Sequence, residues 1–208
     1  MCHVLDAARE SGLFDTIHVS TESSSIADIA NAFGFPVDFM RPNSLADDHT
    51  PIMPVLKFVV DKYQQADHSF DQIWILMACA PLITANDLVG AEELFRGGGG
   101  RAPVLAVSEF QQPIEWALYR ETDGRMVPLQ PGMFSVRSQD LEKRYFDAGA
   151  FAIYSPEIIR SAPDAGSDSF FVGYVLPKGS AVDIDDAHDW ALAEALYNVR
   201  HRAKPTVI

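Results

Sequence analysis

Apolar and polar residues follow one another along this chain in two rhythms, one typical of helices and one typical of strands. Five segments carry apolar residues at helical spacing and are predicted to be amphipathic helices: 2–12, 25–34, 50–66, 84–95 and 190–202. Five others are rich in β-branched and aromatic residues, or apolar throughout, and are predicted to be strands: 16–21, 37–41, 72–78, 104–110 and 147–155. Helices and strands therefore alternate over most of the chain.

This alternation with short connections predicts an α/β fold with a mostly parallel sheet flanked by helices. Segment 72–78 is apolar at nearly every position, as expected of a strand that helices cover on both faces. Between residues 111 and 146 the rhythm is lost, which favours sheet-edge or arm elements over another strand-helix unit. A length of 208 residues fits one domain, 1–208, with this arm within it.

Composition narrows the classes of partner. The formal net charge of −13 argues against binding to nucleic acid and to acidic membrane surfaces. No apolar run approaches the length of a membrane span, and the first residues do not have the pattern of a signal peptide. Cys2 and Cys79 are too few for a disulfide framework or a zinc site, so a cytoplasmic location is expected.

The stretch "VDIDDAHDW", residues 182–190, places acids where a strand is predicted to hand over to a helix. Residues 173–182 are predicted to form two short strands around the Pro-Lys-Gly turn, and if the second strand continues through the acids, Asp183 and Asp185 point to the same face. Paired carboxylates repel each other unless a cation lies between them, and Mg²⁺ is the usual one. The alternative is a helix cap, with Asp185 or Asp186 as the N-cap and Asp189 completing a capping-box-like pair, which explains one acid well and the spaced pair less well.

Ligands of open α/β sheets gather at the carboxyl ends of the strands, where this chain has the segment "ACAP". Small residues and a proline at the end of a central strand leave backbone groups accessible to a ligand. The alternative interpretation is a tight turn that leads into a helix capped by Thr84.

A second candidate is the charged segment 135–149, which contains Arg137, Gln139, Asp140, Lys143 and Arg144. Arginine offers a two-pronged fork for a carboxylate ligand, and lysine does not. A solvated short helix is the alternative interpretation. A serine hydrolase is excluded because there is no Gly-x-Ser-x-Gly elbow.

Five blocks in this order resemble the CMP-sialic acid synthetase (acylneuraminate cytidylyltransferase) family, and especially its bacterial pseudaminic acid cytidylyltransferases. The resemblance covers nearly the whole chain, and the block beginning Arg-Ser-Gln-Asp-Leu and the final Asp-Ile-Asp are specific. The blocks are "GLFDTIHVSTESSSIADIANAFGF", "RPNSLADDHT", "ACAPLITANDL", "RSQDLEKRYFDAG" and "VDIDDAHDW".

The resemblance implies a Rossmann-like nucleotidyltransferase fold and a homodimer in which residues 111–146 serve as a dimerisation and sugar-site arm. It implies that a nine-carbon 2-keto sugar acid (pseudaminic or a related nonulosonic acid) is coupled to CTP with release of pyrophosphate. Asp183 and Asp185 then resemble the acids that hold the Mg²⁺ cofactor, and Arg137 and Gln139 resemble the sugar-acid site. The strand end facing the nucleotide and sugar corresponds to Ala78, Cys79, Ala80 and Pro81.

Some positions depart from the family pattern. Glu22 stands where an aspartate is usual, Cys79 replaces a hydroxyl residue, and Phe146 replaces a histidine. The family's first strand and its Gly-rich, basic nucleotide loop have no counterpart in these residues. The resemblance therefore implies an N-terminally incomplete chain with impaired CTP binding. If the chain nevertheless binds CTP tightly, Arg41 and Lys57 are the first candidates for phosphate contacts.

Two other functions remain open at this point. The chain could be a non-catalytic truncated relative that keeps the arm and the sugar groove. It could also be a nucleotidyltransferase that acts on a different sugar or on a cofactor precursor. A neutral sugar needs no carboxylate fork, so the role of Arg137 distinguishes this last function from the first.

Overall fold

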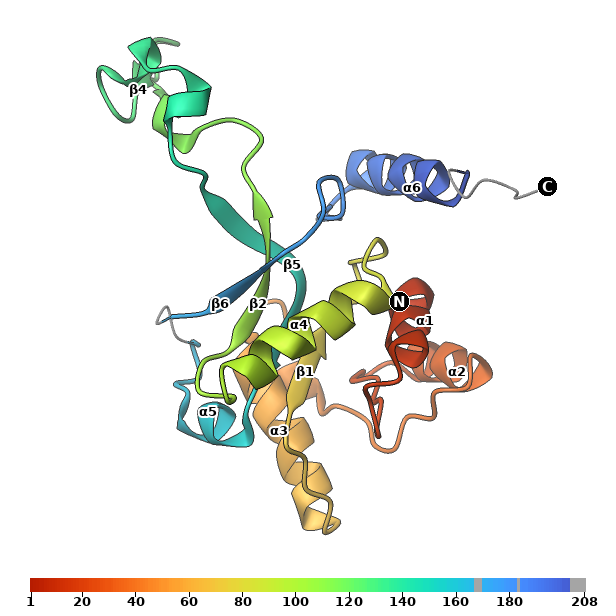
Figure 1. Ribbon diagram of the computed structural model, residues 1–208. Coiled ribbons are helices and arrows are strands. Elements are labelled where there is room, and N and C mark those ends of the chain that lie inside the picture. Colours follow the sequence, from red (N-terminus) through yellow and green to blue (C-terminus); the bar gives the residue numbers. More distant parts are fainter. Residues whose placement is uncertain (167–169, 183, 203–208) are drawn as a thin grey trace, which may run out of the picture.

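The computed structural model describes residues 1–166, 170–182 and 184–202, and the statements below concern these ranges. A rounded body carries two projections, an arm at one corner and a helix at another (Figure 1). The helices are α1 (Cys2–Ser11), α2 (Ser24–Ala32), α3 (Ile52–Gln65), α4 (Ala85–Gly97), α5 (Pro156–Ser161) and α6 (Ala187–Arg202). In the described ranges, no helix has both the length and the apolar character needed to cross a membrane.

The main sheet has four strands in the order β1 (Ile73–Leu76), β5 (Tyr145–Tyr154), β2 (Val104–Glu109) and β6 (Val172–Val175). Strand β5 runs antiparallel to both β1 and β2, whereas β6 runs parallel to β2. Three strands thus share a direction and β5 opposes them, so the predicted α/β fold is present with a mixed sheet. Strand direction was not predictable, because a strand buried on both faces is apolar whichever way it runs.

Helices cover both faces of the sheet, and each face has its own core. On one face α1 and α4 pack through Val4 and Leu88 against Phe151 and Ile153 of the sheet. On the other face α3 and α5 pack around Tyr154 and its neighbours. Side chains alternate along β5, so consecutive residues supply both cores. Strand β5 therefore lies between two helical layers.

The arm lies between residues 111 and 146, where the sequence predicted a break in the strand-helix rhythm. Strands β3 (Leu118–Arg120) and β4 (Met126–Pro128) form a separate antiparallel pair. The Trp116 indole N–H donates to the Met133 carbonyl at 3.0 Å and ties the arm's two halves together. Figure 1 shows the arm projecting well beyond the sheet. No arm residue belongs to either of the two core clusters of the described chain.

Three predicted strands are not formed. Segments 16–21 and 37–41 have no regular secondary structure, and neither do Ala181, Val182 and Ile184. A strand exists only through pairing, and the sheet ends at β1 on one side and at β6 on the other. The local pattern was suited to strands in these segments, but no described neighbour pairs with them.

Candidate active site at the strand ends

The shelf predicted at Ala78, Cys79, Ala80 and Pro81 follows directly after β1. Its backbone turns tightly, and the Ala80 N–H donates to the Met77 carbonyl at 3.1 Å. The N–H groups of Ala78 and Cys79 donate to no described group, and Ala78 is exposed. Ala80 is buried, which anchors the turn to the core. The shelf therefore offers two backbone donors to an anionic or carbonyl ligand.

The alternative interpretation of this segment, a tight turn into a capped helix, is confirmed, and ligand binding by the shelf stays a prediction. Thr84 and Asp87 form a reciprocal capping box at the start of α4. The Asp87 carboxylate accepts hydrogen bonds from the Thr84 N–H at 2.9 Å and from the Thr84 hydroxyl at 2.7 Å. It also lies 3.3 Å from the Tyr174 hydroxyl on β6. This network holds the end of the shelf rigidly against the sheet.

The acids before α6 divide into two roles. Asp186 and Asp189 form the predicted capping box: the Asp186 carboxylate accepts the Asp189 N–H at 3.0 Å, and the Asp189 carboxylate accepts the Asp186 N–H at 3.1 Å. The Asp185 carboxylate is exposed and has no partner among the described groups. Asp183, the other predicted ligand, lies outside the described residues.

The donor chemistry at Asp185 fits a hard cation, since a free carboxylate oxygen is the ligand that Mg²⁺ prefers. The described residues hold no cluster of three or more acidic, histidine or cysteine side chains suited to a metal. One or two carboxylates are nevertheless enough for Mg²⁺ when substrate phosphates and waters complete its coordination. Capping explains Asp186 and Asp189, so it no longer competes for Asp185.

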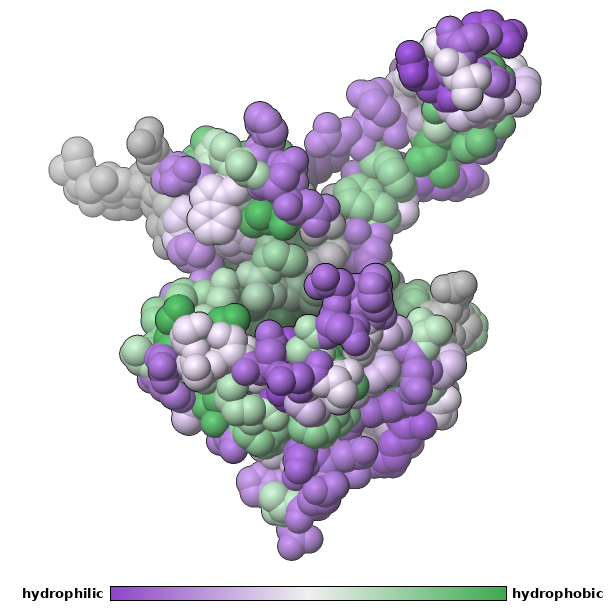
Figure 2. Space-filling view, turned by 180° about the vertical axis from the view of Figure 1, so that it is seen from behind, coloured by the Kyte–Doolittle hydropathy of each residue, from purple (hydrophilic) through white to green (hydrophobic). Residues whose placement is uncertain are grey.

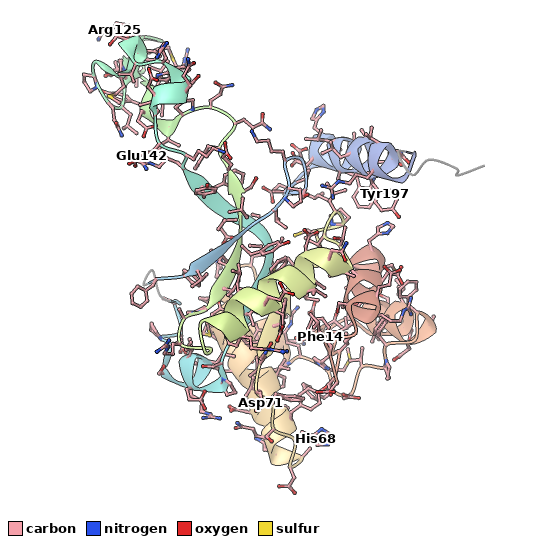
Figure 3. All side chains as sticks on the ribbon, viewed as in Figure 1. Phe14, His68, Asp71, Arg125, Glu142 and Tyr197 are labelled. Carbon is pink, nitrogen blue, oxygen red and sulfur yellow. The ribbon has the colours of Figure 1, made fainter. Side chains whose placement is uncertain are left out.

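Helix α6 is joined to the shelf by its far end. The Arg200 guanidinium donates to the Leu82 carbonyl at 2.7 Å and also to the Ser180 hydroxyl. The Tyr197 ring packs at a tilt against the ring of His3 on α1, with ring centroids 4.4 Å apart, and Figure 3 shows Tyr197 on the side of α6 that faces the body. The loop that carries the acids and the loop that forms the shelf are therefore held to one another through α6.

Arg137 and Gln139 lie in the arm, away from the shelf. The Arg137 guanidinium makes a two-pronged contact with Asp140, at 2.8 and 3.1 Å. Its side chain remains 70% exposed, so a carboxylate ligand can compete with Asp140. Gln139 is exposed and has no described partner. None of the contacts of these two residues reaches the shelf or the acids of the same chain.

A charged cluster at the base of the arm was recognised only in part from the sequence. Glu109 at the end of β2 is contacted by Lys143 at 2.9 Å and by Lys178 at 3.8 Å. The hydrogen bond from Lys143 lowers the pKa of Glu109, and the two lysine charges act in the same direction. Lys178 belongs to the same loop as Asp185. Its only local signal was its place in the Pro-Lys-Gly turn before the acids.

The other side of that cluster is formed by Arg144. Its guanidinium lies 2.6 Å from Glu142, which Figure 3 places at the base of the arm, and 3.5 Å from the buried Glu115. The hydrogen bond with Glu142 raises the pKa of Arg144 above its ordinary value. Figure 2 shows a hollow in the surface between the rounded body and its projections, with apolar residues gathered where the arm and α6 leave the body.

The two basic residues considered for phosphate contacts are both engaged. Arg41 pairs with Glu22, and this hydrogen bond lowers the pKa of the Glu22 carboxyl. Lys57 donates to the Ala162 carbonyl and to Asp164, each at 2.8 Å. Neither cation faces the shelf through any of these contacts.

Several known proteins are similar to this chain in sequence. A family model described as cytidylyltransferase matches residues 1–74. The pseudaminic acid cytidylyltransferase of Campylobacter jejuni is 29% identical over 203 residues, covering 98% of this chain and 87% of that protein. The CMP-N,N'-diacetyllegionaminic acid synthase of Legionella pneumophila is 27% identical, covering 98% and 87%.

The fold has a counterpart among solved structures. A CMP:2-keto-3-deoxy-manno-octonic acid synthetase solved with CTP has a TM-score of 0.52 at 13% identity, covering 96% of this chain and 73% of that one. This likeness concerns the fold alone. Together, the matches agree with the resemblance drawn from the sequence: the chain is similar in sequence to cytidylyltransferases, has a fold like theirs, and is indicated to be a nucleotidyltransferase enzyme.

Proposed function

We propose that this chain is a Mg²⁺-dependent cytidylyltransferase that activates a nine-carbon 2-keto sugar acid, pseudaminic or a related nonulosonic acid, with CTP. The anomeric hydroxyl of the sugar attacks the α-phosphorus of CTP. A new phosphorus–oxygen bond forms, the bond to the β-phosphate oxygen breaks, and pyrophosphate leaves. The names of the Campylobacter and Legionella relatives, a cytidylyltransferase and a CMP-sugar-acid synthase, support this reaction class.

The observation that carries the proposal is that α6 holds together the shelf and the loop that contains the exposed Asp185 carboxylate. The N–H groups of Ala78 and Cys79 have no partner among the described groups, and α6 holds the acidic loop to the loop that contains the shelf. Backbone donors fixed in this way can orient a nucleotide and a sugar without reorganising during the reaction. Asp185 and Asp183 would hold Mg²⁺, which when bound neutralises charge on the phosphates.

We further propose that the protein acts as a homodimer in the cytoplasm. The arm exposes a set of large apolar side chains that a second copy would cover: Leu118, Tyr119, Met126, Leu129 and Phe134. An arm reaching a neighbouring subunit would also bring Arg137 and Gln139 to the partner's shelf, which they do not contact within one chain. The unpaired Cys2 and Cys79 suit a reducing compartment.

A second candidate function, a relative that retains the sugar groove but binds CTP weakly, is favoured by the engagement of Arg41 and Lys57. The three phosphates of CTP keep a net negative charge even with Mg²⁺ bound, and the chain itself has a formal net charge of −13. Exposed backbone amides together with a Lys or Arg normally supply the remainder. A Gly-rich basic loop from polypeptide outside these 208 residues would meet that need.

Titration of CTP in the presence of Mg²⁺, together with a pyrophosphate-release assay, separates the two candidates. The 208-residue chain should bind CTP weakly and turn over slowly. The same chain extended by a strand and a Gly-rich basic loop of roughly 20–30 residues should gain both properties. Tight binding and turnover by the 208-residue chain alone would mean that its own residues form a complete phosphate site.

A further inference from the structure

Arg200, near the end of α6, is a half-buried cation without an ion pair among the described residues. Its guanidinium donates only to neutral oxygens, the Leu82 carbonyl at 2.7 Å and the Ser180 hydroxyl. The other two basic side chains of the described set that are not exposed, Arg41 and Lys57, each pair with a carboxylate. Arg200 therefore carries a positive charge that no described group neutralises.

The packing of α6 places this charge at the end of the shelf. Ala193, Tyr197 and Arg200 recur at helical spacing on the side of α6 that faces the body, where Ala193 is 4% exposed and the Tyr197 ring packs against α1 (Figure 3). Leu82, which accepts from Arg200, directly follows Pro81 of the shelf. Because the shelf turns tightly, the guanidinium lies on the order of 10 Å from the exposed N–H groups of the shelf.

The two acceptors fix the guanidinium and leave several of its donors unused. Leu82 is 3% exposed and Ser180 is 2% exposed, so both acceptors are held by packing. Arginine has five N–H donors and remains charged at physiological pH, so three of the five have no described partner. The N–H groups of Ala78 and Cys79 on the shelf also have none. The end of the shelf thus combines a fixed positive charge with unused N–H groups.

We propose that Arg200 is a substrate-binding residue whose guanidinium attracts an oxyanion of the ligand on the shelf, either the phosphate of the nucleotide or the carboxylate of the sugar acid. A guanidinium binds both groups through charged hydrogen bonds. Water and salt screen a half-buried charge less than an exposed one, which strengthens the contact. This inference rests on the proposed function for the identity of the ligand.

A purely structural role is the alternative, in which Arg200 only ties two loops to the carboxyl end of α6. The two roles differ in what happens when the charge is removed. A structural tie affects anionic and neutral ligands alike, whereas an oxyanion contact affects the anionic ligand alone.

Matched anionic and neutral probes test the proposal on the 208-residue chain. The anionic probes are CMP and N-acetylneuraminic acid, and their neutral counterparts are cytidine and the methyl ester of N-acetylneuraminic acid. The Nε–H signal of Arg200 is followed in proton–nitrogen spectra and is assigned by its loss in Arg200→Gln. We expect this signal to shift with one anionic probe and to stay in place with the neutral counterpart. A shift with CMP identifies the phosphate as the ligand, and a shift with N-acetylneuraminic acid identifies the carboxylate.

Calorimetric titration of two variants measures the contribution of the charge. Arg200→Gln keeps N–H donors for the Leu82 carbonyl but removes the charge, and should raise the Kd of that anionic probe at least about tenfold. Arg101→Gln is the matched control, because Arg101 also has no described ion pair and donates to a backbone carbonyl, that of Gly98 at 3.1 Å. It lies beyond the end of α4 that is far from the shelf, so its loss should change each Kd by less than about twofold.

Three results would overturn the proposal: an unchanged Kd for both anionic probes in Arg200→Gln, an equal loss for an anionic probe and its neutral counterpart, or no binding of either anionic probe to the wild-type chain at roughly 10 mM. Pyrophosphate release by the extended chain tests the proposed function separately. Its absence, together with a charge-dependent Kd, would contradict the reaction and retain the binding role of Arg200.

Discussion

Asp185 and Asp186 are neighbours in the chain, yet their carboxylates have different surroundings. Asp186 is bound to backbone N–H groups at the start of α6, at 2.7 and 3.0 Å, and Asp185 is exposed with no described partner. The two interpretations of the acidic stretch therefore apply to different residues. Capping belongs to Asp186 and Asp189, and the proposed metal role remains for Asp185 together with Asp183.

Asp185→Asn should abolish pyrophosphate release while leaving the melting temperature within about 1 °C. An amide removes the negative oxygen that a hard cation requires, but this side chain supports no described contact. The measurement uses the chain extended by a Gly-rich basic loop, with CTP, Mg²⁺ and sugar acid. Near-normal turnover would remove Asp185 from the proposed metal site.

Arg137→Lys should raise the KM for the sugar acid more than the KM for CTP. Lysine keeps the charge but loses the two-pronged fork, and a charged hydrogen bond is worth about 1.5–3 kcal/mol. Arg125→Lys is the matched control, because Arg125 at the arm's tip pairs with Asp123 in a similar way but is not proposed to bind the sugar (Figure 3). A larger effect on the KM for CTP would mean that the sugar and nucleotide positions are assigned the wrong way round.

At the scale of elements, the caps decide where helices begin beside the shelf. The capping box of Thr84 and Asp87 fixes α4 at the end of the shelf, and that of Asp186 and Asp189 fixes α6 after the acidic loop. Both were predicted from local spacing, because a cap involves residues only three positions apart. A cap can therefore be recognised without knowledge of the fold.

Asp186→Ala should destabilise α6 by about 1 kcal/mol, because the first N–H groups of the helix lose their acceptor. Amide exchange at residues 187–190 should accelerate, and denaturant unfolding should begin at a lower concentration. Asp185→Ala is the control and should change neither quantity. If the two variants unfold alike, the capping box is not what holds the start of α6.

At the scale of the whole molecule, the arm and α6 project from a rounded body (Figure 1). Projections with large exposed apolar side chains are typical of surfaces that another chain covers. Leu129 is 62% exposed and Phe134 is 53% exposed on the arm. This is the structural basis of the proposed homodimer.

Leu129→Glu combined with Phe134→Glu should convert the dimer to a monomer, because two carboxylates would be buried without partners in the interface. Sedimentation equilibrium measures the mass directly. Ile29→Glu, on the body and similarly exposed, is the control and should leave the dimer intact. A wild-type chain that sediments as a monomer would contradict the proposed assembly.

The local pattern was sufficient for every described α-helix except the short α5, for the arm's position, for the tight turn after β1 and for both caps. These features depend on contacts between residues close in sequence, such as the helical spacing of Val4, Leu5 and Ala8 or the three-residue spacing of Thr84 and Asp87. The resemblance to cytidylyltransferases was likewise readable, since it rests on short blocks such as "VDIDDAHDW".

Tertiary structure alone decided which segments became strands and which charges remained free. Thr16–Ser20 has a strand-like pattern but pairs with no described segment, because pairing is a property of two segments and not of one. The direction of β5, the pairing of Arg41 with Glu22 and the approach of Lys178 to Glu109 join residues far apart in the sequence. Spacing along the chain carries no information about such distances, which are set when the helical layers and the sheet pack together.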